Sequence, residues 1–314
     1  MPFKASTWAV ALTSLQDYLR RTPSNPDTAQ FRVRAQYNIA LTQRSLGSDR
    51  NYRAALREVV TVFRASGQQP GSPAAQWAAE ALFRDLDDQV NEFTRVQFQQ
   101  GDAAALRAQI DRFKAQLRAI DAAARDVVGL RGGEYSIGAL TRQGEAHEYL
   151  ATQEARVGSL IQLSAAQQAN FRRAEASIAQ LRAAADTLER AGRDEQAQAL
   201  RDRADGLQQQ LDDQRTGAIQ QVQESFDQEA EAERKLAIIN YGTAVHTSRT
   251  QNIPTPYAAR ALEHMRLDEN RPLVDAALSQ QRVFEYRSGM FDGEAPGATV
   301  TQTTPLAGPG LVSE

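Results

Sequence analysis

The stretch of sequence that decides the fold is IAQLRAAADTL, residues 178–188. Its apolar positions are Ile178, Leu181, Ala185 and Leu188, so the spacing alternates between three and four residues. This spacing is the seam of a coiled coil, and a strand would place the same residues on both of its faces. Most of the segment consists of strong helix formers. It therefore predicts a long helix with one narrow apolar stripe.

A second stripe follows in a shifted phase. Its positions are Leu200, Leu207, Leu211, Ala218 and Val222. Between the two stripes, Gly192 can adopt a left-handed C-cap and Asp194 can cap a new helix. We expect residues 165–235, which are rich in Gln, Ala and Arg, to form a long antiparallel hairpin that turns near Gly192. A continuous rod with a stutter is the alternative.

The rest of the chain is also rich in helix formers, and its Pro and Gly residues cluster at a few breaks. The predicted helices are 5–21, 28–46, one through 54–63, 74–99, 103–128, 134–157, 257–267 and 271–286. The fold class is therefore all-α. The predicted domains are helical hairpins over 1–164, the long hairpin over 165–235, closing helices over 236–286 and a disordered tail over 287–314.

Charge and composition exclude several classes of function. The net charge is −3 and the pI is about 5.8, so nucleic acid is not an expected partner. The absence of cysteine excludes disulfides and thiolate chemistry. No stretch approaches the 18 apolar residues of a membrane span, and the first residues open into a helix without a signal-peptide core. The cytoplasm and the periplasm both remain open.

The segment from Tyr37 to Leu56 shows the spacing of a two-helix repeat. Its markers are Tyr37-Asn38-Ile39-Ala40, Leu46-Gly47, Tyr52 and Ala54-Ala55-Leu56. The pattern resembles a tetratricopeptide unit with about three extra residues in the inter-helix turn, within residues 48–51. Residues 75–83 resemble the first helix of a further, degenerate unit. The resemblance implies an α-solenoid of tetratricopeptide-like hairpins over residues 1–164.

Two later blocks sharpen the resemblance. Residues 134–150, EYSIGALTRQGEAHEYL, are similar to a block of large tetratricopeptide proteins of the myxobacterial cell envelope, those associated with adventurous gliding motility. Residues 241–245 and 252–262 are similar to the block that closes their repeat arrays. The resemblance implies a periplasmic or envelope-associated protein that binds other proteins in a multiprotein assembly. The long hairpin at 165–235 departs from that family.

Candidate catalytic and metal-binding groups are isolated. His147, His246 and His264 have no second ligand at a metal-binding spacing. The acidic clusters Asp85, Asp87, Asp88 and Glu229, Glu231, Glu233 are read as solvated helix faces. The glycine-rich segment 129–133 lacks the features of a phosphate loop and is read as a connector. We therefore expect no catalytic residue, no cofactor and no metal.

The remaining functional feature is surface. A helical-hairpin solenoid offers a concave groove for a partner helix or an extended peptide, and its candidate positions here are Arg34, Asn38 and Gln76. The leading hypothesis is a non-catalytic protein–protein interaction scaffold of a bacterial cell envelope. The alternative is a structural module that forms homo-oligomers through residues 165–235. A hydrolytic enzyme is a remote third possibility.

Overall fold

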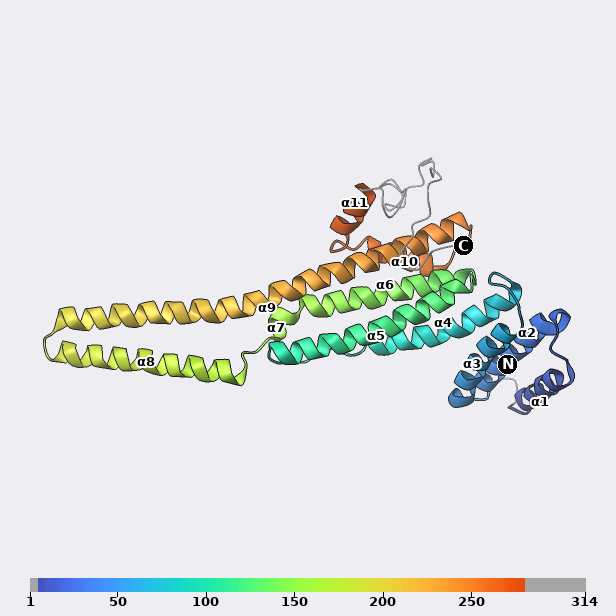
Figure 1. The fold of residues 1–314 in the computed structure, drawn as a ribbon, viewed down its shortest axis with the longest axis horizontal. Helices are drawn as coiled ribbons and strands as arrows, with labels where there is room; N and C mark the ends of the chain where they lie inside the picture. Colours follow the sequence, from blue (N-terminus) through green and yellow to red (C-terminus); the bar gives the residue numbers. More distant parts are fainter. Residues whose placement is uncertain (1–4, 280–314) are drawn as a thin grey trace. The chain divides into compact units, whose positions relative to one another are not determined.

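The computed structural model describes residues 5–279, and every regular element in this range is an α-helix (Figure 1). The helices are α1 (Ala5–Arg21), α2 (Pro26–Ser45), α3 (Asp49–Ala65), α4 (Pro73–Phe93), α5 (Ala103–Gly129), α6 (Glu134–Ala155), α7 (Val157–Leu160), α8 (Ala165–Arg190), α9 (Asp194–Thr250), α10 (Pro256–Met265) and α11 (Arg271–Ser279). The predicted all-α class is confirmed. The predicted tail over 287–314 and the end of the last predicted helix lie outside the described residues.

The chain divides into two compact units. Unit 1 comprises Met1–Val96, Ala115–Tyr149 and Glu233–Glu314, and unit 2 comprises Gln97–Lys114 and Leu150–Ala232. Helices α5, α6 and α9 run through the boundaries, so these boundaries fall inside helices. Helix α9 in particular continues for 57 residues, past the predicted boundary between the hairpin and the closing helices.

Helices α2, α3 and α4 form the first core of unit 1, and local sequence signals set their ends. The Asn25 side chain accepts a hydrogen bond from the Thr28 backbone N–H at 2.9 Å, as part of a capping box. Gly47 ends the turn after α2 with φ of 74°, a conformation that suits glycine. The small buried residues Ala40 and Ala78 belong to this core, where they allow helices to approach closely.

Two boundaries differ from the sequence expectation. Residues 49–51, expected in a lengthened turn, instead form the first turn of α3. Helix α4 was expected to reach residue 99 but ends at Phe93, where the Thr94 hydroxyl donates to the Val90 carbonyl at 3.0 Å. The chain then places Phe98 in the core of unit 2, with its ring 4.8 Å from that of Phe113. Burial of Phe98 there is incompatible with a continuous helix and explains the earlier end.

A second core of unit 1 joins α6 to the last part of α9 and to α10. Tyr241 and Ile137 are fully buried in this core. Gly144 faces Tyr241 so closely that a Cβ atom there would lie 2.5 Å from the ring. Glycine at this position therefore permits the close contact between α6 and α9.

Unit 2 contains the antiparallel hairpin of α8 and the first part of α9 (Figure 1). The two helices are separated by residues 191–193, and Gly192 has φ of 72°. A narrow seam that includes Ile178, Ala204 and Leu211 is buried between them. The turn lies where the sequence placed it, so the chain forms a hairpin here rather than a continuous rod. Over residues 5–279, no helix has the length and hydropathy needed to cross a membrane.

Candidate functional site

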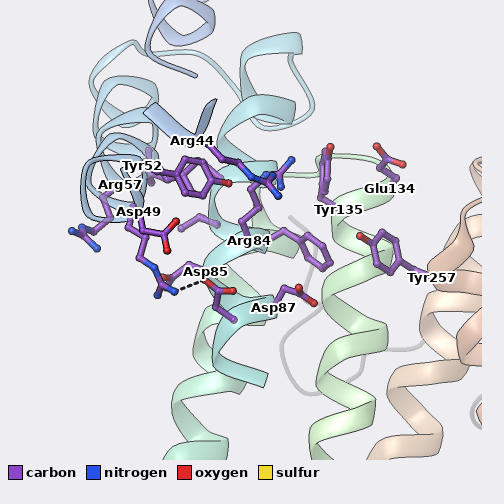
Figure 2. A pocket seen from close by; sticks show the side chains of 17 residues that line it. Arg44, Asp49, Tyr52, Arg57, Arg84, Asp85, Asp87, Glu134, Tyr135 and Tyr257 are labelled. Atoms are coloured by element: carbon purple, nitrogen blue, oxygen red, sulfur yellow. Dashed lines mark ion pairs between the residues drawn. The ribbon is translucent and has the colours of Figure 1, made fainter. Parts of the chain in front are cut away.

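A pocket of about 510 Å³ lies in unit 1, between the α3–α4 hairpin and the starts of α6 and α10 (Figure 2). We call it the α3–α4 pocket. The residues that line it are Arg44, Asp49, Tyr52, Arg53, Leu56, Arg57, Val60, Ala81, Leu82, Phe83, Arg84, Asp85, Asp87, Asp88, Glu134, Tyr135 and Tyr257. Four of them are arginines and three are tyrosines. Its lining is therefore aromatic and strongly charged.

Arg84 of α4 lies in the middle of the pocket (Figure 2). It donates from Nε to the Glu80 carboxylate at 3.2 Å, one helical turn earlier. Burial lowers the pKa of Arg84, but the hydrogen bond to Glu80, the charge of Glu80 and the neighbouring tyrosines Tyr52 and Tyr37 together outweigh this effect and raise it. The Tyr37 and Tyr135 hydroxyls also donate to Glu80, and the pKa of each tyrosine is raised by burial and by this carboxylate. The charge of Arg84 is thus matched within the protein.

Arginines from α2 and α3 lie on one side of Arg84. The Arg44 guanidinium lies 5.7 Å from the centre of the Tyr52 ring. Arg53 forms an ion pair with Asp88 at 3.1 Å. Arg57 follows Arg53 by four residues on the same face of α3 and is exposed. These arginines lie among the carboxylates Asp49, Asp85 and Asp88, so the charges on this side largely offset one another.

The opposite side of the pocket is aromatic and acidic. It is formed by Glu134 and Tyr135 of α6 and by Tyr257 of α10 (Figure 2). The Tyr257 and Tyr135 rings pack on Phe83 of α4, with centroid distances of 5.0 and 5.8 Å. Burial raises the pKa of Tyr257, and the negative charges of Asp87 and Glu134 raise it further. Two carboxylates thus act on this side of the pocket, and the charges of Arg84 and Arg142 partly oppose them.

Asp87 connects the pocket to a buried polar network in unit 1. Arg142 of α6, which is 6% exposed, contacts the Asp87 carboxylate at 2.8 Å and donates to the Asn91 side chain at 2.5 Å. It also forms an ion pair with Glu145, which in turn contacts Arg260 of α10 at 2.5 Å. These contacts join α4, α6 and α10, the helices that carry the pocket lining around Tyr257.

Two of the three histidines belong to this buried region. His147 lies between Asp121 of α5, at 3.0 Å, and Glu233 of α9, at 2.6 Å. Burial lowers the pKa of His147, but hydrogen bonds to these two carboxylates dominate and raise it to about 9. His264 contacts Glu148 at 2.5 Å and stacks on Tyr241 at 5.0 Å. Within residues 5–279, no group of three His, Asp or Glu side chains is arranged to hold a metal ion.

The interpretation of the acidic clusters as solvated faces is wrong for Glu229 and Glu233, whose side chains are 25% and 15% exposed, whereas Asp87 and Asp88 stay nearly half exposed. Asp87 and Asp88 are paired with arginines and line the pocket. Glu233 holds His147. Glu229, in unit 2, contacts Arg107 at 2.7 Å and also forms an ion pair with Lys114. Their cationic partners are distant in sequence, which is why the periodicity did not reveal them.

The three groove candidates lie on α2 and α4, outside the set of residues that line the pocket. Arg34 is exposed and its guanidinium lies 5.9 Å from the Trp77 ring. Gln76 is exposed on α4, and Asn38 is half-buried on α2. The sequence reasoning did not identify Arg84, Tyr135 or Tyr257. The only signal in the sequence was the local density of Arg and Tyr. That signal does not connect Tyr257 with Arg84 and Tyr135, because Tyr257 is far from both along the chain.

Comparisons with known proteins give no relative of this chain: no family model matches it, and neither does any curated protein or solved structure. The tetratricopeptide and gliding-motility resemblance therefore stays a prediction.

Proposed function

We propose that this chain is a non-catalytic protein–protein interaction scaffold, and that the α3–α4 pocket is its docking site. The observation that carries the proposal is the concentration of Arg and Tyr side chains in one pocket between helical hairpins. Tyrosine and arginine are the residue types most enriched among the energetically dominant residues of protein interfaces. Their large side chains bury contact area and still offer polar groups to a partner.

The pairing of three charged groups in the pocket supports binding rather than catalysis. Catalytic acids and bases need a proton that can be transferred to or from a substrate. In the pocket, Arg84 is matched by Glu80, Arg53 by Asp88 and Asp87 by Arg142. Among the described lining residues there is no serine, threonine or histidine. Such a lining is suited to hold a fixed surface for a partner.

The proposed setting is a multiprotein assembly of a bacterial cell envelope. This part of the proposal rests on the resemblance of residues 134–150 and 241–262 to envelope proteins of the gliding-motility type. We expect the partner to present a helix or an extended segment to the pocket, because both are common ligands of grooves between helices.

The proposal is tested by photo-cross-linking from inside the pocket. A photoreactive phenylalanine analogue at Tyr52 is exposed to an envelope extract of the source bacterium, and cross-linked proteins are identified by mass spectrometry. We expect a specific product that the double substitution Arg44→Glu and Arg57→Glu abolishes.

The matched control is the double substitution Arg50→Glu and Arg64→Glu. It makes the same change in net charge on exposed positions of α3 that do not line the pocket. We expect this control to retain the product. Loss of the product in both double variants, or no product at all, would contradict the proposal.

A further inference from the structure

The aromatic and acidic side of the α3–α4 pocket has a specific recognition chemistry. The rings of Tyr135 and Tyr257 pack against Phe83. Both tyrosines also line the pocket. The Glu134 carboxylate stands next to Tyr135 at the start of α6 and is exposed (Figure 2). It forms no ion pair with any residue in the described range, 5–279.

The neighbouring positive charges are already matched. Arg84 donates to Glu80, and Arg142 is bound by Asp87 and Glu145. The Asp87 side chain is nevertheless 42% exposed, so it can accept a further donor from the pocket. The five carboxylates of the lining exceed its four arginines by one, and Glu134 is the unmatched group on the aromatic side. This side therefore has an excess of negative charge.

Carboxylates next to aromatic faces are the groups that bind a guanidinium. Arginine forms paired hydrogen bonds with a carboxylate and stacks its planar group on a tyrosine ring. An anionic side chain would meet Glu134 and Asp87 there, and an aliphatic side chain would leave Glu134 partly desolvated without a partner. Charge complementarity thus selects a cationic side chain, and the two tyrosine rings favour the planar guanidinium of arginine among the cations.

We propose that the aromatic and acidic side of the α3–α4 pocket binds an arginine side chain presented by the partner protein, with Glu134 as its main ionic contact and Tyr135 and Tyr257 as its stacking surface. This inference rests on the proposed docking function and specifies the chemistry of the segment that docks. Arg44 and Arg57, on the other side of Arg84, contact the rest of that segment.

The test uses three short peptides and the full chain. The probes are acetyl-Gly-Arg-Gly-amide, the same peptide with citrulline in place of arginine, and the same peptide with glutamate. Citrulline retains the shape of arginine but lacks its charge. Binding is followed by NMR of the chain labelled on its tyrosine rings, with the Tyr135 and Tyr257 signals assigned from Tyr135→Phe and Tyr257→Phe.

We expect the arginine peptide to shift both signals in a saturable manner and the other two peptides to bind at least about tenfold more weakly. Glu134→Gln weakens binding of the arginine peptide by about tenfold, since it removes the main ionic contact. The matched control is Asp85→Asn, an exposed lining position on the other side, and it changes affinity by less than about twofold. Circular dichroism verifies that each variant is folded.

Equal binding of the arginine and citrulline peptides overturns the inference, and so does unchanged binding in Glu134→Gln. Free arginine amide is a further arm. If it binds as tightly as the peptide, the site serves a small molecule and not a docking segment, which also overturns the inference. Failure of this inference and failure of the proposed function are distinguishable. A cross-linked partner whose captured segment has no arginine refutes only the arginine inference. Binding of the arginine peptide without any cross-linked partner refutes only the proposed docking function.

Discussion

At the scale of single residues, His147 is the clearest case of a side chain whose environment differs from its sequence context. It is 5% exposed and lies between the carboxylates of Asp121 and Glu233, which come from two other helices. An uncharged histidine in this position would leave two partly buried carboxylates without the cation that they share. The contact therefore stabilises the protonated imidazole and, with it, the meeting of α5, α6 and α9.

This arrangement predicts a loss of stability at alkaline pH. The pKa of His147 is about 9 in the folded chain, against an ordinary value near 6.5. A pKa that is higher in the folded chain than in the unfolded chain stabilises the fold. This stabilisation is complete at pH values below the pKa of the unfolded chain, and it is lost as the pH rises through the pKa of the folded chain. Between these limits the free energy of unfolding should fall by up to about 1.4 kcal/mol per pH unit.

Urea unfolding at pH 6, 7.5 and 9 measures this slope. His264, whose pKa is also raised, mainly by its hydrogen bond to Glu148, contributes in the same direction. His147→Gln should therefore reduce the slope without abolishing it. An identical slope in the chain and in His147→Gln would show that folding does not raise the pKa of His147.

Gly144 gives a second prediction at this scale. A Cβ atom at Gly144 would lie 2.5 Å from the Tyr241 ring, so Gly144→Ala forces α6 and α9 apart. We expect a destabilisation of about 1–3 kcal/mol, as for other overpacked core sites. Gly217→Ala is the matched control, because no neighbouring atom lies within 4 Å of its Cβ position and alanine favours the helix. Thermal unfolding should show a lower midpoint for the first variant and an equal or higher one for the second.

At the scale of elements, the helices follow local signals closely. Capping residues such as Asn25 and Ser164 and the glycine at residue 192 fix the ends of their helices, and these signals are visible within a few residues of sequence. The end of α4 was mispredicted because Phe98 is buried against Phe113 of α5 and its backbone N–H donates to Gln153 of α6, contacts made with other helices. A helix end that depends on tertiary packing leaves no local signal.

The pocket could not be predicted for the same reason. Tyr257 and Tyr135 meet on Phe83 only after α10 and α6 have packed on α4. The sequence suggests that partners bind to a groove, but its three candidate residues lie on α2 and α4 outside the pocket lining. The ion pairs of Glu145 with Arg142 and Arg260 also hold α6 and α10 together, and none of these contacts shows in a periodicity.

The α8–α9 hairpin gives a prediction at the scale of an element. Ala204 is fully buried in its narrow seam. Ala204→Leu should destabilise the hairpin by about 1–3 kcal/mol, because the larger side chain does not fit between closely packed helices. Ala183→Leu, at an exposed position of α8, is the control and should have little effect.

Hydrogen exchange measures the effect of Ala204→Leu locally. We expect faster exchange at amides of α8 and of residues 194–232 in α9, with the amides of α2 and α3 unchanged. Uniformly faster exchange over the described residues would show that the hairpin does not unfold as a separate unit.

At the scale of the whole molecule, the apolar surface informs the oligomeric state. The large hydrophobic side chains that the described residues expose most are Val10, Phe31 and Val96, at 67%, 54% and 51%, and they lie on or after different helices. Few large apolar side chains of the described residues are exposed, whereas the interface of an obligate dimer is more apolar than an ordinary protein surface. The hairpin seam, which includes Ile178 and Ala204, is occupied within one chain.

We therefore expect a monomer of 34.6 kDa in light scattering at micromolar concentration. A stable dimer would favour the alternative of a homo-oligomerising module. In that case, a shift to monomer after shortening of the α8–α9 hairpin would identify the hairpin as the interface. An unshifted dimer would place the contact elsewhere.

The antiparallel pairing of α8 with α9 also constrains how such a chain can change in length. Residues gained or lost in α8 must be matched by an equal number in the facing part of α9. An unequal change would slide one helix along the other and separate Ile178 from Ala204 and Leu211, with which it forms the seam. Steps of seven residues preserve the side of each helix on which the stripe lies. We therefore expect insertions and deletions in this region to be tolerated in pairs of equal size on the two sides of Gly192, because a single one shifts the register of the seam between its position and the open end of the hairpin.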